Sequence, residues 1–312
     1  MIVVTAGNKY LDIDAYASCI AYTKLLNSMG VQAIFATSAQ PNVSVASNVR
    51  DYDKMMVVNY ESNLNDEFVV LDVSNPEFID KIVNLENIVE VIDHHTGFED
   101  FWAKKGCKSQ IEFIGSVATM IFEKIIEEDK AEILDASLCK LLTAAILDNT
   151  LNLKSSITTK RDLQAYEMLK VLGQIEPNFD EKYFRSCQTE VNKDVVLAVK
   201  RDIKNEYVAD ILPTVFGQIT VYDKEPIFEE SQKLSDMFET FNKSWLLNVI
   251  CIKDGKSYIF STDAQAQQNL QKLFKSKFSN DVLVLENFML RKQIMKQART
   301  YAELNENKQK NN

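Results

Sequence analysis

The sequence is poor in several residue types on which common folds and sites depend. It has only two histidines, which are adjacent, five cysteines without a Cys-x-x-Cys pair, and eight glycines, none of them neighbours. An odd number of cysteines without such a pair indicates reduced thiols, so we expect a cytoplasmic protein. No internal disulfide framework is predicted.

Long apolar runs and an excess of positive charge are also missing. No run approaches the roughly 18 residues of a membrane span, and the apolar start ends at Gly7 and Asn8, so we expect neither a membrane segment nor a signal peptide. The 35 Lys and Arg face 45 Asp and Glu, a formal net charge of -10. Nucleic acid is therefore not expected as a general partner, because its binding depends on cations that neutralise phosphates.

The length and the composition predict a globular protein of two domains. The chain has 312 residues, of which 46% are hydrophobic and 26% charged, and this is too long for one ordinary core. We place the domains at residues 1–185 and 193–305. The polar segment 171–192, with Gly173 and Pro177, is the candidate linker.

The first domain is predicted to be α/β, with a doubly wound parallel sheet. Apolar runs that read as strands alternate with helical periodicity, which places helices on both faces of such a sheet. The expected strands are 1–4, 31–36, 68–72 and 88–93. The expected helices are about 15–29, 77–85, 116–129 and 137–147, with another after the cap Thr158-Thr159. The aromatic residues of the loop that contains Phe98, Phe101 and Trp102 are expected to form a small satellite core.

The second domain is predicted to be a smaller α/β unit with a mixed sheet. Two apolar runs, 246–252 and 257–261, are joined by Lys253-Asp254-Gly255-Lys256, and Asp-Gly between such runs is a signal for a short hairpin. A helix over 264–278 and a strand over 282–285 are expected to follow.

Both histidines lie in Val91-Ile92-Asp93-His94-His95-Thr96-Gly97, directly after the apolar run Ile88 to Ile92. A buried strand would thus end in a carboxylate and two imidazoles. The carboxyl ends of strands open into the ligand crevice of an α/β sheet, so this position favours chemistry. The alternative is two surface histidines that happen to follow an aspartate.

Other acids follow apolar segments in the same way. Asp12 and Asp14 lie after the first strand, Asp72 ends the run Phe68 to Leu71, and Asp148 closes the helical pattern 138–147. Four carboxylates in one crevice repel one another unless cations are present. The alternative is a set of isolated helix caps and surface acids.

These motifs together resemble the DHH phosphoesterase superfamily, named for a triplet such as Asp93-His94-His95. The similarity covers nearly the whole chain, since Gly115-Ser116-Val117-Ala118-Thr119 and Leu147-Asp148-Asn149-Thr150 follow in the order and spacing of the family. The second domain resembles that of the branch with family II inorganic pyrophosphatases and exopolyphosphatases. Relatives that cleave oligonucleotides or cyclic dinucleotides usually carry a Gly-Gly motif, which this sequence lacks.

The resemblance implies a centre of two divalent ions, Mn²⁺ or Mg²⁺, with Co²⁺ as an alternative. One ion would lie on Asp12 and Asp72, and the other on Asp14, Asp72, His94 and Asp148, so that Asp72 bridges. Two ions about 3.5–4 Å apart can lower the pKa of a shared water and direct the hydroxide at phosphorus. A serine or cysteine nucleophile is disfavoured, because no further histidine could act as its base.

The resemblance also implies roles around the metals. Asp93 would orient an imidazole and would not bind a metal. His95 would donate a hydrogen bond to the substrate phosphate. In the second domain Lys204, Arg291 and Lys292 would bind the phosphates, and Asp72, His95, Lys204 and Arg291 would form the catalytic set. The motif Arg291-Lys292-Gln293 is one basic residue shorter than in the family, and solvated surface charges are the alternative for these cations.

Asn8 departs from most pyrophosphatases of this type, which have a histidine at this position. Eukaryotic-type exopolyphosphatases resemble this chain in having Gly-Asn there. An amide is a weaker ligand for a soft transition ion than imidazole, so we expect lower Mn²⁺ selectivity and good activity with Mg²⁺.

The predicted function is hydrolysis of inorganic phosphoanhydrides, either pyrophosphate or short-chain polyphosphate. The partner is then a small anionic phosphate compound, with neither nucleic acid nor membrane, and a homodimer stays open. One alternative is a phosphodiesterase for short or cyclic nucleotides. Another is a relative without turnover that acts as a binding scaffold.

Overall fold

A computed structural model describes residues 1–205 and 207–310 of the chain. It consists of two compact units, Met1–Ser186 and a second that begins at Cys187. The boundary lies inside the helix α6 (Phe179–Lys193), which occupies part of the segment that we predict as the linker. Among the described residues no helix is both long enough and apolar enough to cross a membrane.

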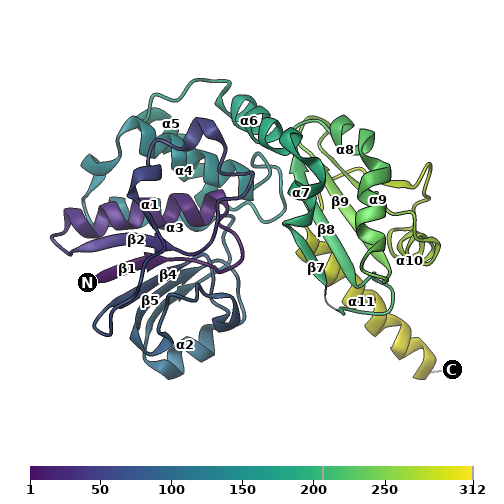
Figure 1. Ribbon diagram of the computed structural model, residues 1–312, viewed down its shortest axis with the longest axis horizontal. Coiled ribbons are helices and arrows are strands. Elements are labelled where there is room, and N and C mark those ends of the chain that lie inside the picture. The colour runs from purple at the N-terminus through teal and green to yellow at the C-terminus, as the bar shows by residue number, and fades with distance from the viewer. Residues whose placement is uncertain (206, 311–312) are drawn as a thin grey trace. The chain divides into compact units, whose positions relative to one another are not determined.

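The N-terminal unit contains a parallel sheet with the strand order β3-β2-β1-β4-β5-β6 (Figure 1). Its strands are β1 (Ile2–Thr5), β2 (Ala33–Thr37), β3 (Met56–Val58), β4 (Glu67–Leu71), β5 (Ile88–Asp93) and β6 (Lys108–Ile111). The order reverses between β1 and β4, as in doubly wound sheets, and ligands bind such sheets where the order reverses. The fold class predicted for this domain is confirmed.

Helices cover both faces of this sheet. The helices α1 (Ile13–Ser28), α3 (Val117–Glu127), α4 (Ala136–Asn149) and α5 (Lys160–Leu172) lie on one side, and α2 (Glu99–Lys105) lies on the other (Figure 1). Trp102 of α2 is fully buried against Phe68, Val70 and Val91. Phe98 also packs against this core of the sheet, whereas Phe101 is 38% exposed, so the separate satellite core that we expected is not formed. Phe101 and Trp102 lie in a helix where we expected a loop.

Three elements of this unit differ from the sequence prediction. The helix expected over residues 77–85 is replaced by two short 3₁₀ turns, 76–78 and 85–87. The carboxylate of Asp80 accepts hydrogen bonds from Thr37 Oγ1 at 2.9 Å and from Ser38 N at 2.6 Å, and this ties the segment to the end of β2. The two strands β3 and β6 were not predicted, because they are short edge strands in which most residues are at least partly exposed.

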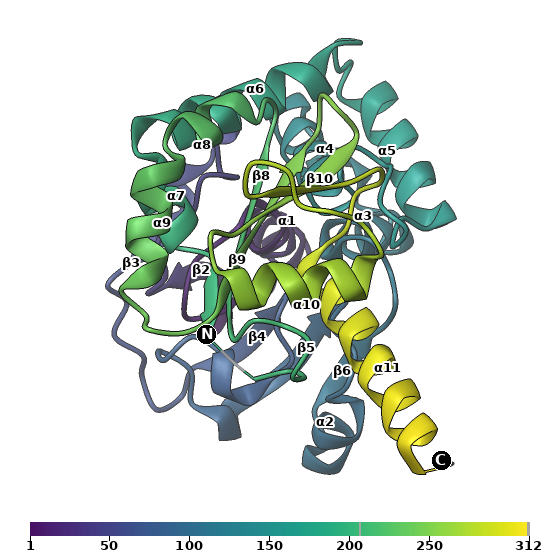
Figure 2. The same cartoon turned by 90° about the vertical axis from the view of Figure 1, so that its right-hand side faces the viewer.

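The second unit contains a mixed sheet with the order β11-β10-β9-β8-β7 (Figure 2). Its strands are β7 (Ile203–Asn205), β8 (Val215–Val221), β9 (Trp245–Cys251), β10 (Lys256–Phe260) and β11 (Val282–Leu285). Only the β8 and β9 pair is parallel, so the mixed sheet is confirmed. The predicted hairpin between β9 and β10 is also confirmed, with Gly255 at φ +70° in its turn.

The helices of this unit are α7 (Val195–Lys200), α8 (Glu225–Glu229), α9 (Ser231–Glu239), α10 (Ala264–Phe274) and α11 (Arg291–Lys310). Leu270 of α10 and Ile294 of α11 share a core with Phe216 and Ile259 of the sheet. On the other face β8 approaches α9 closely, since a Cβ at Gly217 would lie 2.6 Å from Phe238 Cζ. One layer of side chains therefore separates the sheet from helices on each face.

Candidate metal centre

The carboxyl edge of the N-terminal sheet carries the acids and histidines that the sequence analysis selected. Asp72 directly follows β4, and Asp93 is the last residue of β5, with His94 and His95 next. Asp12 lies in the connection after β1 and begins α1, because its Oδ1 accepts a hydrogen bond from Ala15 N at 3.0 Å. Strands β1, β4 and β5 are neighbours, so these side chains come from adjoining positions along one edge.

Asp72 has an unusual backbone conformation. Its φ is +61°, and its N–H still donates to Ile92 O at 2.9 Å, so the chain turns sharply where β4 ends. Left-handed geometry is uncommon for residues other than glycine, although aspartate and asparagine tolerate it better than most, and strained residues of this kind cluster at functional sites. The Asp72 side chain is only 6% exposed. Its Oδ1 accepts no hydrogen bond within the described part of the chain.

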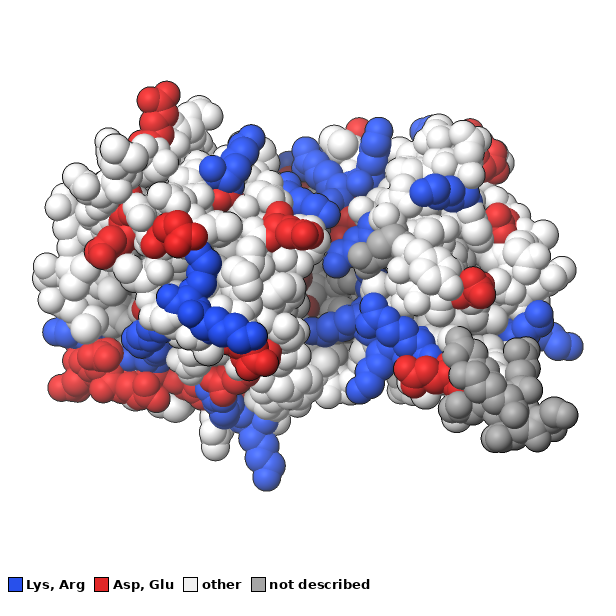
Figure 3. Space-filling view, turned by 90° about the horizontal axis from the view of Figure 1, so that it is seen from below, with Lys and Arg blue, Asp and Glu red and all other residues white. Residues whose placement is uncertain are grey.

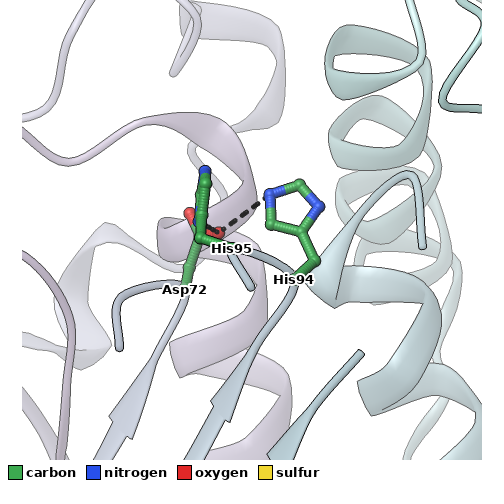
Figure 4. A group of neighbouring side chains, drawn as sticks. All are labelled: Asp72, His94 and His95. Atoms are coloured by element: carbon green, nitrogen blue, oxygen red, sulfur yellow. Dashed lines mark ion pairs between the residues drawn. The ribbon is translucent and has the colours of Figure 1, made fainter. Parts of the chain in front are cut away.

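His94 presents a ring nitrogen to this oxygen. Its Nδ1 lies 3.0 Å from Ile114 O, which can only accept, so Nδ1 carries the hydrogen. In the neutral ring the lone pair of Nε2 therefore faces Asp72 Oδ1 at 3.5 Å (Figure 4). Two acceptors that face each other in a buried site require a cation or a proton between them. A backbone carbonyl that fixes the far nitrogen is also typical of a metal-binding histidine.

Asp93 organises the two histidines from the other side. Its Oδ1 accepts from the backbone N–H groups of His94 at 2.7 Å and His95 at 3.0 Å, and it lies 2.8 Å from His95 Nδ1. Burial would raise the pKa of Asp93, but the hydrogen bond and the positive charge of His95 lower it below its ordinary value. The His95 side chain is 55% exposed, so its ring is accessible to a ligand.

Four aspartates of the centre, Asp12, Asp14, Asp72 and Asp148, have raised pKa values because they are buried. Burial raises the pKa values of Asp12 and Asp72, and the negative charges of Asp12 and Asp14 raise the pKa of Asp72 further. Burial likewise raises the pKa values of Asp14 and Asp148 to about 7 each. A cation beside these oxygens would stabilise their charged forms.

The donor set fits divalent metal ions. Carboxylate oxygens and one imidazole nitrogen suit Mg²⁺ and Mn²⁺, and the unsatisfied Oδ1 of Asp72 is the kind of atom that a cation would bind. Among the described residues Asp72, His94 and His95 form the group whose ligand atoms all lie within 4.8 Å of one another. The predicted ligands Asp12, Asp14 and Asp148 are electrostatic neighbours of one another but are not members of this group.

Asp14 is already surrounded by donors of the protein. Its Oδ1 accepts from Ser116 Oγ and Ala118 N, and its Oδ2 accepts from Val117 N, each at 2.8 Å. Asn149 Nδ2 also donates to Oδ2. Asp14 thus anchors the N-terminus of α3, where backbone N–H groups lack partners within the helix. A cation can bind Asp14 only if one of these bonds is lengthened.

Gly115, in the motif before α3, is required by the packing around it. A Cβ at this position would lie 2.7 Å from both Asp162 Oδ2 and Thr150 Cγ2. The close approach lets Gly115 N donate to Asp162 Oδ2 at 3.0 Å. This glycine therefore keeps Ile114, whose carbonyl orients His94, close to the segment after α4.

Asn8 is held by the turn that replaces the predicted helix. Its Nδ2 donates to Glu77 O at 3.2 Å, and its N–H donates to Phe78 O at 2.8 Å. The side-chain nitrogen of Asn8 is thus used as a donor. Its side-chain oxygen is the atom that could bind a metal ion, as a weak ligand.

Two residues next to the aspartates were not assigned a role by sequence reasoning. Asn149 donates to Asp14, and its position beside Asp148 in a family motif was the available signal. Tyr183 of α6 donates to Asp148 Oδ1 at 3.0 Å. No sequence pattern indicated Tyr183, because 35 residues separate it from its partner.

The predicted phosphate-binding cations all lie in the second unit. Lys204 of β7 and Lys292 at the start of α11 are exposed. Arg291 has a side chain that is 7% exposed, and its Nη2 lies 2.9 Å from Asp202 Oδ1 and 2.6 Å from Asp202 O. Its guanidinium also lies over the ring of Phe216, with 5.3 Å between them. Arg291 is thus paired with Asp202, although its buried Nε has no hydrogen-bond partner among the described residues. The two lysines lie at the surface.

Comparison with known proteins defines the class. Residues 2–146 match the family model of the DHH family, N-terminal domain. This match covers most of the N-terminal unit, and the resemblance that its motifs indicated is confirmed.

Similarity to particular proteins extends over both units. The chain is 26% identical over 311 residues to a probable manganese-dependent inorganic pyrophosphatase of Clostridium acetobutylicum, an alignment that covers 93% of this chain and 94% of the relative. It is also 26% identical over 312 residues to a manganese-dependent inorganic pyrophosphatase of Methanothrix thermoacetophila, with the same two shares.

Solved structures show the same fold. A putative family II inorganic pyrophosphatase of Methanococcus jannaschii matches with a TM-score of 0.72 at 21% identity, over 97% of this chain and 100% of the other. An exopolyphosphatase-related protein of Bacteroides fragilis matches with a TM-score of 0.51 at 14% identity, over 97% and 92%. The fold is thus shared with these proteins over nearly the whole chain.

Proposed function

We propose that this chain is a metal-dependent hydrolase of inorganic phosphoanhydrides, with pyrophosphate or short-chain polyphosphate as its substrate. The observation that carries the proposal is the buried Oδ1 of Asp72, which faces the Nε2 acceptor of His94 without a donor between them. The names of the relatives, manganese-dependent inorganic pyrophosphatases, support both the metal and the substrate class.

The proposed ligands are those that the family resemblance implies. Asp12 and Asp72, with Asn8 as a weak ligand, would hold one divalent ion, and Asp14, Asp72, His94 and Asp148 would hold the other. Such a pair of ions lowers the pKa of a bound water and neutralises charge on phosphate oxygens. We propose Mn²⁺ or Mg²⁺ as the bound ion, with Co²⁺ as an alternative.

Other residues of the chain would bind the phosphates of the substrate. Asp93 holds His95 Nδ1 and thereby orients the ring, and when both ring nitrogens carry hydrogen the other one would donate to an oxygen of the substrate phosphate. Lys204 and Lys292 are exposed ammonium groups that suit a polyanion. For Arg291 the pairing with Asp202 supports a role in fixing the start of α11, and direct phosphate binding remains a prediction.

The test is release of phosphate by the full chain from a panel of substrates, with Mg²⁺ and separately with Mn²⁺. Pyrophosphate, tripolyphosphate and longer polyphosphate decide the chain length, and a dinucleotide and a cyclic nucleotide test the phosphodiesterase alternative. We expect hydrolysis of at least one inorganic substrate to exceed that of both nucleotides. Comparable cleavage of the nucleotides, or no turnover of any substrate with metal bound, would refute the proposal.

The predicted cytoplasmic location and the open question of a homodimer are separate from this reaction. Size-exclusion chromatography with light scattering, with and without Mn²⁺, measures whether the chain forms a homodimer.

A further inference from the structure

Tyr183 is a fully buried tyrosine on the first half of α6. Its ring lies between those of Phe179 and Phe184, with centroid distances of 6.4 Å and 5.1 Å. Its hydroxyl faces two acceptors, Ser44 O at 2.9 Å and Asp148 Oδ1 at 3.0 Å. One phenolic hydrogen therefore connects a loop carbonyl with a carboxylate of the candidate metal centre.

Ser44 extends this connection to the other aspartates. Its Oγ accepts from Ile13 N at 2.9 Å, and Ile13 is the residue between Asp12 and Asp14. Asn42 holds Ser44 in place, because its Oδ1 accepts from Ser44 N at 2.9 Å and from Ser44 Oγ at 2.6 Å. The hydroxyl of Tyr183 is thus the junction between Asp148 and the segment that carries Asp12 and Asp14.

The turn behind Asp148 is strained and also contacts α6. Leu151, Asn152 and Leu153 have φ values of +51°, +57° and +61°, three consecutive left-handed residues of which none is glycine. Such a run is costly and persists only where surrounding contacts enforce it. Asn152 N donates to Leu147 O at 2.7 Å, and Asn152 Nδ2 donates to Asp180 Oδ2 of α6 at 3.3 Å.

We propose that Tyr183 is a positioning residue of the metal centre, which acts through Asp148. Its hydroxyl fixes Oδ1 of Asp148 and the distance of this carboxylate from the Asp12-Ile13-Asp14 segment, while the left-handed turn fixes the end of α4. The metal site is thereby preorganised, and its affinity for the ion depends on a residue that touches neither metal nor substrate. This inference rests on the metal centre of the proposed function.

A purely structural role makes a different prediction. If the hydroxyl only satisfied the buried Ser44 carbonyl, its loss would lower the free energy of unfolding and leave metal affinity unchanged. Tyr22 offers a matched control, because it is also buried and its hydroxyl donates to a buried carboxylate, Glu90, which is not one of the proposed ligands.

The test compares Tyr183→Phe with Tyr22→Phe in the metal-free full chain. Isothermal titration with Mn²⁺ should show affinity about tenfold weaker for Tyr183→Phe and unchanged for Tyr22→Phe, while thermal melts show lower stability for both. In turnover assays Tyr183→Phe should need about tenfold more Mn²⁺ for half-maximal activity, and saturating Mn²⁺ should restore most of kcat. A second variant, Ser44→Ala, removes the acceptor for Ile13 N and should also weaken Mn²⁺ binding.

Two results would overturn the inference. The first is Mn²⁺ affinity of Tyr183→Phe and Ser44→Ala within twofold of the unmodified chain, which would leave the metal centre standing and make Tyr183 structural. The second is an unmodified chain that binds no Mn²⁺ at all, which would remove the proposed metal centre and this inference with it. The two failures are therefore distinguishable in the same titration.

Discussion

The two units treat buried charge in opposite ways. In the second unit the buried guanidinium of Arg291 is paired with a counter-charge, since the partly exposed Asp202 supplies both a carboxylate and a backbone carbonyl. At the carboxyl edge of the N-terminal sheet, Asp72 is buried with an oxygen that has no donor and with other carboxylates as neighbours. The charge of Arg291 is therefore balanced, whereas that of Asp72 is not.

This difference separates structural charges from those that await a ligand. The N-terminal unit also contains buried acids that are satisfied, such as Asp162, which accepts from Gly115 N and from Thr119 Oγ1. Burial of an acid is therefore not sufficient evidence for a metal. A buried carboxylate oxygen without a donor, beside other carboxylates and a correctly oriented imidazole, is stronger evidence.

The surface carries mixed charge. Lys and Arg side chains are scattered among Asp and Glu on the face that Figure 3 shows. The excess of 10 acidic groups is a property of the whole sequence. The aspartates of the candidate metal centre, by contrast, are buried, so solvent screens their charges little.

Replacing Asp72, the carboxylate that we propose to bridge the two ions, should have the largest effect. Asp72→Asn keeps the shape, and asparagine tolerates the φ of +61° at this position. We expect turnover to fall on the order of 1000-fold or more, because a charge that would stabilise the reacting centre is lost. The metal-free variant should be more thermally stable than the unmodified chain, since a buried repulsion is relieved.

Glu90→Gln is the matched control for this substitution. Glu90 is also buried, but Lys108 lies 2.8 Å from its carboxylate, so its charge is balanced. This variant should lose stability and keep its Mn²⁺ affinity. Retained turnover in Asp72→Asn would break the comparison and exclude the bridging role.

Substitution of Arg291, which pairs with Asp202, should lower stability more than it affects turnover. Arg291→Met removes the guanidinium that pairs with Asp202, and we expect the free energy of unfolding to fall by about 3 kcal/mol, the lower end of the range for such pairs. The Asp202 side chain is 31% exposed, which limits the cost. Urea denaturation measures this effect, and KM for the preferred substrate measures the predicted contact with phosphate.

Lys256→Gln provides the exposed comparison. Its partner Glu286 has a side chain that is 74% exposed, so the loss should be within about 1 kcal/mol. An Arg291→Met variant with unchanged stability and a raised KM would show that Arg291 serves the ligand and not the fold.

The pH dependence of the metal-free chain should reveal the unbalanced charge. The pKa values of Asp14 and Asp148 are raised from 3.8 to about 7, so the folded chain binds more protons than the unfolded chain between these values. The contribution of these groups to the free energy of unfolding therefore falls as the pH rises from 3.8 to about 7. Melting temperatures across this range, with and without Mn²⁺, measure it.

Mn²⁺ should raise the melting temperature most at the upper end of the range, because protons compete with the metal for the same oxygens. Equal stabilisation by Mn²⁺ at pH 5 and pH 8 would contradict the assignment of these carboxylates as ligands.

The smallest effect is expected at Asn8. Asn8→His replaces the amide with an imidazole, and we expect Mn²⁺ or Co²⁺ affinity to rise roughly tenfold with little change for Mg²⁺. Competitive metal titration measures the ratio. An unchanged ratio would remove Asn8 from the list of ligands, and Asn8→Gln controls for loss of the bond to Glu77 O.

Much of the N-terminal edge could be predicted from local sequence. The run Ile88 to Ile92 forms β5, and the triplet after it lies at the carboxyl end of this strand, as expected. Asp72 follows β4, and Asp12 caps α1. These predictions succeed because buried parallel strands are continuous apolar runs, and the residues that follow them must leave the sheet at one edge.

The failures concern features whose causes lie far along the chain. The segment 77–85 has helical spacing, but Asp80 binds residues at the end of β2, and these bonds decide its conformation. The contacts of Asp14 with α3 join residues about 100 positions apart. Neither could be seen in a local window, because hydrogen bonds across such distances depend on how the strands are ordered.

The amino-acid sequence by itself determined the types of donor available and their placement after strands, because apolar runs and the residues that end them are local properties. Tertiary structure alone decided which of these donors are already satisfied. It tied Asp14 to the start of α3, paired Arg291 with Asp202, and left Asp72 Oδ1 without a donor. The physical reason is that burial and hydrogen bonding set the energy of a charge, and both depend on neighbours that only the folded chain brings together.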